Sequence, residues 1–240
     1  MNSAFKIRLA AVQDRIIAAC ERCGRNSNEI TLVAVSKTFP FARIEDAAGA
    51  GQVHFGENYI QDCVAKMVQA RNRNLPLQWH FIGHLQSNKV KFYDNGFHLF
   101  HGLDSMKLAR SLARKAVADE FKARVLVQVN IGDEATKAGI PAASLFDFLS
   151  EIGYIEGLSI EGLMAIPPAG ASAEASRPYF RSLFKLFTEA QAEFIPVFPE
   201  FKQLSMGMSK DFEVAVEEGA TIVRVGSLLF GEREKKVVVN

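Results

Sequence analysis

The 240-residue sequence is poor in cysteine, with only Cys20, Cys23 and Cys63, which are too few and too unevenly placed for a disulfide framework. The first two form "CERC" near the end of a predicted helix, without the strand-to-helix turn that a redox motif needs. No second Cys/His pair stands at zinc-ligand spacing. We therefore expect a reducing, cytoplasmic location.

The sequence also lacks an excess of charge and any long apolar run. Lys and Arg number 28 against 27 acidic residues, so the net charge of +1 gives no electrostatic reason to expect nucleic acid or an anionic membrane as a partner. No run of 18 apolar residues occurs, and the N-terminus lacks the apolar core of a signal peptide. With 48% apolar and 23% charged residues, the composition is typical of a soluble globular protein.

A dinucleotide-binding G-x-G-x-x-G after the first predicted strand is absent too, which counts against an open Rossmann-like sheet. Eight strand-like runs alternate instead with segments of helical periodicity, and several strands are apolar on both faces. This pattern and the chain length predict a single (β/α)8 TIM barrel over residues 1–240, with a preceding helix at 1–25 and a short tail at 232–240. The predicted strands lie within 31–37, 53–58, 77–83, 97–104, 124–132, 158–166, 201–207 and 221–231.

The carboxyl ends of barrel strands and the loops after them form the functional face of this fold. Lys37 ends the first strand, in "TLVAVSKTFP", where a lysine is usually a solvated loop residue. After the sixth strand, "PPAGASAEAS" at 167–176 predicts a mobile loop on the same face.

Arg224 lies between two valines in a strand that reads as buried, so its guanidinium needs an anion or a strong acceptor. The structural alternative to a ligand is an ion pair with a buried carboxylate such as Glu161 or Glu57. The sequence leaves this choice open.

Small residues at the ends of the last two strands, Ser205, Gly207, Gly226 and Ser227, would let backbone N–H groups approach a phosphate. His80 and His84 are four residues apart, a spacing that does not put them on one face of a strand, so a metal pair is not expected. His80 reads equally as a core or a pocket residue. A lysine beside a phosphate-binding end suggests a phosphorylated aldehyde held as a Schiff base, and pyridoxal 5'-phosphate offers both groups.

Motifs along nearly the whole chain, about residue 5 to Arg233, resemble those of the pyridoxal phosphate homeostasis proteins. They are "LVAVSKTFP", "HFGENYIQD", "WHFIGHLQSNK", "EGLMAIPP" and "LSMGMSKDFEVAVEEGATIVRVGSLLFGER". The resemblance implies a fold-type III barrel like the alanine racemase N-terminal domain. It also implies that the protein carries and buffers the cofactor, as the family does, without an established reaction.

The resemblance also implies roles for individual residues. Lys37 would form the Schiff base, and Arg224 would face the pyridine nitrogen. The phosphate would be held by Ser205, Gly226 and Ser227, and the ring lined by Asn58, His80 and Met208. The loop "GDEATKAG", at 132–139, departs from the family pattern and leaves the role of Lys137 open.

The alternative function is a racemase-like enzyme, which needs an acid/base group on each face of the cofactor. The racemases take the second group, a tyrosine, from a further β-rich domain, whereas nine residues follow Gly231 here. The four tyrosines, Tyr59, Tyr93, Tyr154 and Tyr179, fall in helical or linker segments. We therefore expect a monomeric, non-catalytic carrier that passes the cofactor to apo-enzymes. A class I aldolase with Glu57 as proton shuttle is a third, weaker alternative.

Overall fold

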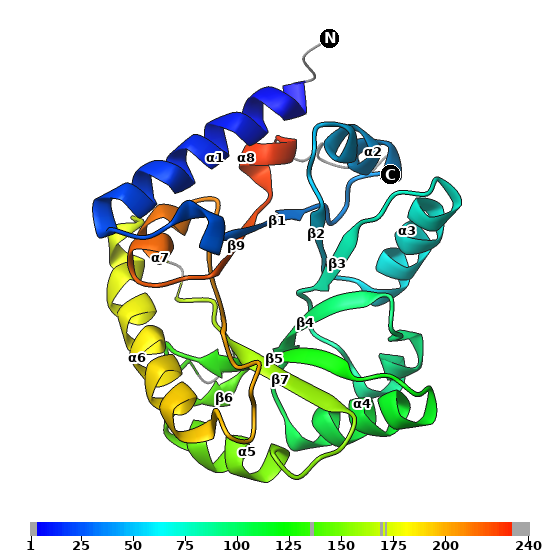
Figure 1. The fold of residues 1–240 in the computed structure, drawn as a ribbon, viewed down its shortest axis with the longest axis vertical. Coiled ribbons are helices and arrows are strands. Elements are labelled where there is room, and N and C mark those ends of the chain that lie inside the picture. Colours follow the sequence, from blue (N-terminus) through cyan, green and yellow to red (C-terminus); the bar gives the residue numbers. More distant parts are fainter. Residues whose placement is uncertain (1–3, 135–136, 169, 171, 232–240) are drawn as a thin grey trace, which may run out of the picture.

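The computed structural model describes residues 4–134, 137–168, 170 and 172–231. Parallel strands form a closed ring with helices around its outside (Figure 1), which confirms the predicted (β/α)8 barrel. The strands are β1 (Thr31–Val35), β2 (His54–Glu57), β3 (Gln78–Phe81), β4 (Phe97–Leu103), β5 (Ala123–Asn130), β6 (Ile140–Pro141), β7 (Leu158–Met164), β8 (Gln203–Met208) and β9 (Ile222–Val225).

Eight of these strands make the ring, in the order β4-β3-β2-β1-β9-β8-β7-β5, and pairing of β4 with β5 closes it. All eight correspond to the strands predicted from the sequence. The ninth, β6, has two residues and pairs only with the end of β5. Its length is too short for a sequence pattern to reveal.

The helices are α1 (Ala4–Cys23), α2 (Phe41–Gly49), α3 (Ile60–Asn72), α4 (Met106–Ala118), α5 (Leu145–Ile152), α6 (Arg177–Phe194), α7 (Phe212–Glu217) and α8 (Ser227–Phe230). Four short 3-10 turns, at Ser27–Glu29, Ser87–Phe92, Ala142–Ser144 and Glu174–Ser176, complete the described elements. The turn at Ser87–Phe92 takes the place of a helix between β3 and β4. No helix of the described chain is long and apolar enough to cross a bilayer.

Helix α1 lies across the outside of the barrel rather than between two strands (Figure 1). Its buried residues, Phe5, Leu9, Val12, Ile16 and Ala19, recur at intervals of three and four and so form one apolar stripe. Cys20 is buried at the end of this helix, and the Cys23 thiol donates to the Ala19 carbonyl, so the "CERC" pair is part of helix packing.

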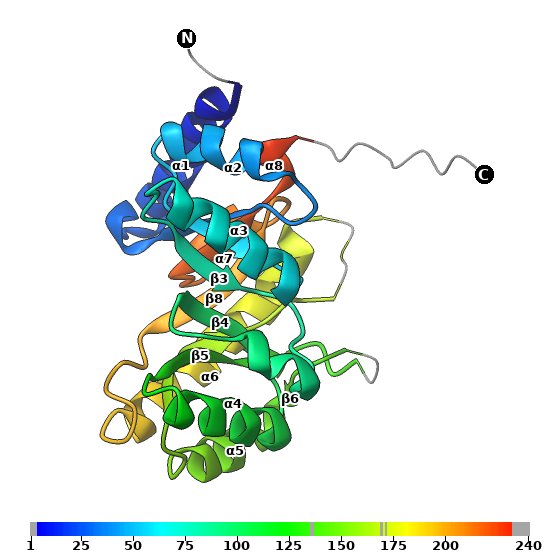
Figure 2. The ribbon, with the colours of Figure 1, turned by 90° about the vertical axis from the view of Figure 1, so that its right-hand side faces the viewer.

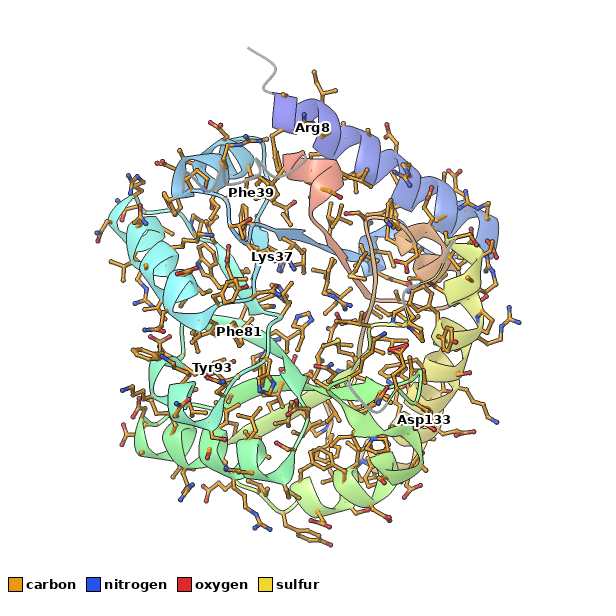
Figure 3. All side chains as sticks on the ribbon, turned by 180° about the vertical axis from the view of Figure 1, so that it is seen from behind. Arg8, Lys37, Phe39, Phe81, Tyr93 and Asp133 are labelled. Atoms are coloured by element: carbon orange, nitrogen blue, oxygen red, sulfur yellow. The ribbon has the colours of Figure 1, made fainter. Side chains whose placement is uncertain are left out.

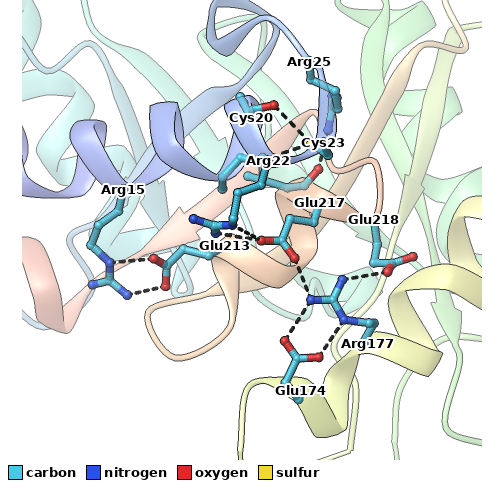
Figure 4. Close-up of polar contacts among 12 residues, drawn as sticks. Arg15, Cys20, Arg22, Cys23, Arg25, Glu174, Arg177, Glu213, Glu217 and Glu218 are labelled. Carbon is cyan, nitrogen blue, oxygen red and sulfur yellow. Dashed lines mark hydrogen bonds and ion pairs between the residues drawn. The ribbon is translucent and has the colours of Figure 1, made fainter.

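Ion pairs join α1 to α7 and α7 to the start of α6 (Figure 4). Arg15 binds Glu213 through two nitrogens, at 3.1 and 2.7 Å. Arg177 reaches Glu217 at 2.6 Å and Glu218 at 2.8 Å. These contacts fix α7, the helix that follows β8, against its two neighbours.

The inside of the barrel has two kinds of lining. Apolar side chains from five strands form a small separate core: Val33, Leu99, Leu126, Met164 and Ile222. Polar side chains share this interior, among them His80, His101, Ser205 and Arg224, all 4% exposed or less. Since the helices pack on the outer face, these polar groups must be satisfied by one another or by a ligand.

All eight ring strands are parallel, so their carboxyl ends lie at one end of the barrel. In Figure 2 the chain after β5 and after β7 extends out on one side of the barrel. Residues 169 and 171 of the loop predicted to be mobile, and the predicted tail at 232–240, lie outside the described residues. The predicted single-domain bounds of 1–240 stay a prediction.

Candidate functional site

A cavity of about 790 Å³ opens where six of the ring strands end. Its walls come from residues at or just after the carboxyl ends of β1, β2, β3, β7, β8 and β9, the end of a barrel at which functional sites form. Six of the residues predicted from the sequence line it: Lys37, Asn58, Met208, Arg224, Gly226 and Ser227. Figure 3 shows Lys37 on the inner side of the ring.

Lys37 follows β1 by two residues and is held at the cavity by a tight turn. The Ser36 N–H donates to the Gly56 carbonyl, and the Phe39 N–H returns to the Ser36 carbonyl. Thr38, between them, has a φ of 70°, a left-handed conformation that is rare outside glycine. The chain thus reverses around Lys37 instead of carrying it into a flexible loop.

A buried group of polar residues supports this turn from below. The Ser36 hydroxyl and the Lys66 ammonium both donate to Glu57 Oε1 at 2.6 Å, and Lys66 also donates to the Ser36 carbonyl at 3.1 Å. Burial raises the pKa of Glu57, against the opposing effect of Lys66. Glu57 is therefore a structural anchor. Among the described residues it does not line the cavity, which removes the proton-shuttling carboxylate on which the aldolase alternative rested.

Arg224 presents its guanidinium to the floor of the cavity from β9. Its Nη1 donates to Ser205 Oγ at 2.5 Å and its Nη2 to the Ala165 carbonyl at 3.1 Å. The two carboxylates considered as alternatives are paired elsewhere, Glu161 with Arg124 and Glu57 with Lys66. The alternative of an ion pair between Arg224 and one of these two carboxylates is therefore wrong. Neutral acceptors bind the Arg224 guanidinium, and its charge faces the cavity.

The guanidinium remains a cation despite its surroundings. Burial lowers the pKa of Arg224 to about 10, so it is charged at neutral pH. A buried positive charge with only neutral acceptors favours an electron-rich partner in the adjoining space. This agrees with the prediction that the Arg224 guanidinium needs an anion or a strong acceptor.

Two predicted residues, Ser205 and His80, lie beneath the cavity and not in its wall. Ser205 is fully buried, and its hydroxyl contacts both Arg224 and His101 Nδ1, the latter at 2.9 Å. His80 is 1% exposed and bonds to two other histidines, His54 and His101, at 2.9 Å each. Both residues precede the ends of their strands; Ser205 contacts Arg224 directly, and His80 is linked to it through His101 and Ser205.

The sequence analysis missed Ser209, the second serine of "SMGMS", which does line the cavity. Its hydroxyl accepts a hydrogen bond from the Gly226 N–H at 3.2 Å. The end of β8 at Met208 explains the difference, because Ser205 lies inside the strand whereas Ser209 follows it. Ser209, Gly226 and Ser227 together form the small-residue end of the cavity.

Two polar contacts hold the loops around the cavity. Asp211 accepts from the Met208 N–H at 2.7 Å and from the Ser176 hydroxyl at 2.9 Å, which joins the chain after β8 to the chain after β7. Lys137, whose role the sequence left open, donates to the Pro167 carbonyl at 3.2 Å and pairs with Glu134 at 2.9 Å. Pro167 lines the cavity, so the hydrogen bond from Lys137 supports this part of the wall, although Lys137 does not itself line the cavity.

The cavity wall also contains a buried acceptor without a partner. Asn58 Oδ1 has no hydrogen-bond partner within the described residues. A buried unsatisfied polar atom costs about 1–3 kcal/mol, which a ligand hydroxyl could offset. The amine of Lys37, this acceptor, the Arg224 charge and the Gly226 end together fit an aromatic aldehyde that carries a phosphate.

Comparison with known proteins places this fold and site in a class. The family model for the alanine racemase N-terminal domain matches residues 7–234. An alanine racemase structure from Clostridium difficile superimposes with a TM-score of 0.65 at 16% identity, over 95% of this chain and 61% of that one. At this identity the likeness shows the shared barrel alone. The class is therefore the alanine racemase-type (β/α)8 barrel.

Closer relatives narrow the class. The pyridoxal phosphate homeostasis protein of Aquifex aeolicus is 43% identical over 227 residues, which are 95% of this chain and 97% of that protein. A structure of PipY from Synechococcus elongatus with PLP bound matches with a TM-score of 0.81 at 34% identity, over 95% of this chain and 100% of that one. The chain belongs to the pyridoxal phosphate homeostasis protein family.

Proposed function

We propose that this protein binds pyridoxal 5'-phosphate covalently through Lys37, and that it carries and releases the cofactor in vitamin B6 homeostasis. The observation that carries the proposal is that Lys37 and Arg224 line one cavity, in a chain 34% identical to a protein with PLP bound. When bound, the cofactor supplies an aldehyde that an amine can attack and a ring that accepts electrons.

The residues of the cavity divide the binding between them. Lys37 supplies the amine at one side, and the hydroxyls of Ser209 and Ser227 supply donors for the phosphate at another, where Gly226 leaves room for it and its N–H holds the Ser209 hydroxyl. Asn58 Oδ1 supplies an acceptor for the ring hydroxyl. Arg224 supplies a charged donor that does not give up its proton at neutral pH, so it orients a ring nitrogen without protonating it.

The same lining argues for a carrier. Racemisation needs a second proton donor opposite Lys37. Among the described residues no tyrosine lines the cavity: Tyr59 and Tyr154 are exposed, Tyr93 is buried in the outer core, and Tyr179 lies on α6. Asp211 lines the cavity, but both its oxygens accept hydrogen bonds from the protein. Among the described residues of the wall, Lys210 is the other lysine, and it makes the racemase alternative testable.

We further propose that the chain acts as a cytoplasmic monomer that gives the cofactor to apo-enzymes. A cavity with an open mouth admits water, which favours exchange of the bound aldehyde over reactions that require a closed site. An apo-enzyme incubated with the loaded protein should regain activity as the cofactor leaves.

A visible absorption spectrum recorded before and after borohydride tests the proposal, followed by mass measurement of the peptide that keeps the label. We expect a visible band from the loaded protein and a label on Lys37. Lys37→Ala should lose both, and Lys210→Ala, which alters another lysine of the same wall, should keep both. A label that persists on Lys37→Ala would contradict the assignment.

A further inference from the structure

A second cluster of titratable groups lies at the opposite end of the barrel, where the strands begin. His54 is the first residue of β2, His98 the second residue of β4, and His80 lies on β3 between them. Their ligand nitrogens all lie within 4.8 Å of one another. His80 is buried, while His54 and His98 are partly exposed, so the cluster can be reached from this mouth of the barrel.

Strand register brings these three residues together. In β2 and β3, His54 is paired with Gln78 and Gly56 with His80, so the two imidazoles lean toward each other across one step of the sheet. Their nitrogens, His54 Nδ1 and His80 Nε2, are 2.9 Å apart. A shift between Trp79 and His80 in the pairing with β4 lets His98 lie beside both.

The spacing of the rings agrees with a three-histidine metal site. The ring centroids are 5.2 Å apart for His54 and His80, 5.4 Å for His54 and His98, and 5.0 Å for His80 and His98. Three imidazoles bound tetrahedrally with Zn–N bonds of about 2.0 Å place their ring centroids about 5 Å apart. Side-chain rotation alone would therefore bring the three nitrogens to one metal.

The surroundings resemble the outer contacts of metal ligands. A metal-bound histidine usually donates its other ring N–H to a neighbouring acceptor, and His80 Nδ1 is already 2.9 Å from His101 Nε2. Arg124 Nη1 lies 3.2 Å from His98 Nδ1, but Arg124 also binds Glu161 through two other nitrogens, at 2.5 and 2.9 Å. The Glu161 carboxylate balances the charge of the Arg124 guanidinium. When a metal ion replaces Arg124 as the partner of His98, Arg124 keeps its ion pair with Glu161.

We propose that His54, His80 and His98 bind one divalent transition metal ion of the zinc type at the mouth of the barrel opposite the cofactor cavity. Three protein ligands leave the fourth tetrahedral position to water. Imidazole nitrogens suit Zn²⁺, Ni²⁺ and Cu²⁺ better than Mg²⁺ or Ca²⁺, which prefer oxygen. The site is distinct from the Lys37 cavity and does not depend on the proposed function.

Titration of the full-length, chelator-treated protein with Zn²⁺, and separately with Co²⁺ as a spectroscopic probe, tests the site. We expect one equivalent per chain and a four-coordinate Co²⁺ spectrum. His54→Gln and His98→Gln should each weaken Zn²⁺ binding by about a hundredfold or more, since loss of a ligand exceeds the effect of its outer contacts. His84→Gln is the matched control, because His84 is exposed and lies beside Asp104, away from the cluster.

Absence of saturable binding to the unmodified protein would overturn the proposal. Equal affinities of the unmodified protein and the His54→Gln/His98→Gln variant would do so too, as that would show binding elsewhere on the surface. Thermal melting of each metal-free variant and its loading with pyridoxal phosphate check that the barrel is intact. Normal cofactor loading with lost Zn²⁺ binding is the expected pattern for both variants.

Discussion

Replacement of Ser205 by alanine removes a hydroxyl that two buried groups share. Ser205 Oγ is the acceptor for Arg224 Nη1 and the partner of His101 Nδ1, and all three residues are 4% exposed or less. Alanine fits the space but leaves a charged donor and an imidazole nitrogen without this partner. Of its hydrogen bonds to described residues, Arg224 would keep the one to the Ala165 carbonyl.

The expected cost is that of one buried hydrogen bond to a charged group together with one to a neutral group. This amounts to about 2–4.5 kcal/mol of unfolding free energy. For a chain of this length it corresponds to a fall in Tm of roughly 4–18 °C. Urea unfolding of the cofactor-free protein measures the loss without any contribution from bound ligand.

Ser209→Ala is the matched control, because it removes a hydroxyl from the cavity wall instead of the interior. Its stability should change little, while its affinity for pyridoxal phosphate should fall more than its affinity for pyridoxal. Ser205→Ala should show the reverse pattern, with a large loss of stability and similar losses for both ligands. If Ser205→Ala kept full stability and lost only phosphate-dependent affinity, the position we assign to this hydroxyl would be refuted.

Three further outcomes are expected. Gly226→Val, whose added Cβ would lie 3.4 Å from the Val35 carbonyl, should weaken binding of pyridoxal phosphate far more than that of pyridoxal, and equal losses by equilibrium dialysis would count against a phosphate at this end. The loaded protein in deuterated water with L-alanine should show little Cα exchange by mass spectrometry, and rapid exchange abolished by either Lys37→Ala or Lys210→Ala would establish a racemase-like enzyme. Burial lowers the pKa of His98 to about 4, so the unfolded chain binds more protons than the folded one below about pH 6.5. The urea midpoint should therefore fall between pH 7 and pH 5, less steeply for His98→Gln, and an unchanged slope would mean that His98 is not the group responsible.

The barrel could be predicted because each strand can be recognised from its own short stretch of sequence. "RVLVQVNIG" and "LSIEGLMAI" are apolar on both faces, and each is followed by a helical segment. The position of Lys37 follows from the same reasoning, since a residue just after a buried strand belongs to the carboxyl end of the sheet. Strand ends are less certain than strands: the small-residue pattern and the family resemblance point to Ser205, whereas β8 continues to Met208 and Ser209 lines the cavity.

Contacts between distant strands could not be predicted. The sequence showed that Arg224 needs an acceptor, but the acceptors are a hydroxyl on β8 and a carbonyl after β7, which no charge pattern reveals. His80 and His84 are four residues apart, a spacing that does not put them on one face of a strand. The relevant neighbours of His80 lie on β2 and β4, and only the register of three strands brings them together.

The row of hydrogen bonds from His54 through His80 and His101 to Ser205 can point in one of two directions, which the histidine tautomers decide. Arg224 can only donate to Ser205 Oγ, so the serine hydrogen is available to His101 Nδ1. When the serine donates to His101, His101 and His80 carry their hydrogens on Nε2, and every donor in the row points away from Arg224. A cation on His80 Nε2 would require the opposite direction throughout, with His101 donating to Ser205. Because one row cannot point both ways, substitutions at His54 and at Arg224 should be non-additive in a double-mutant cycle, although they lie at opposite mouths of the barrel.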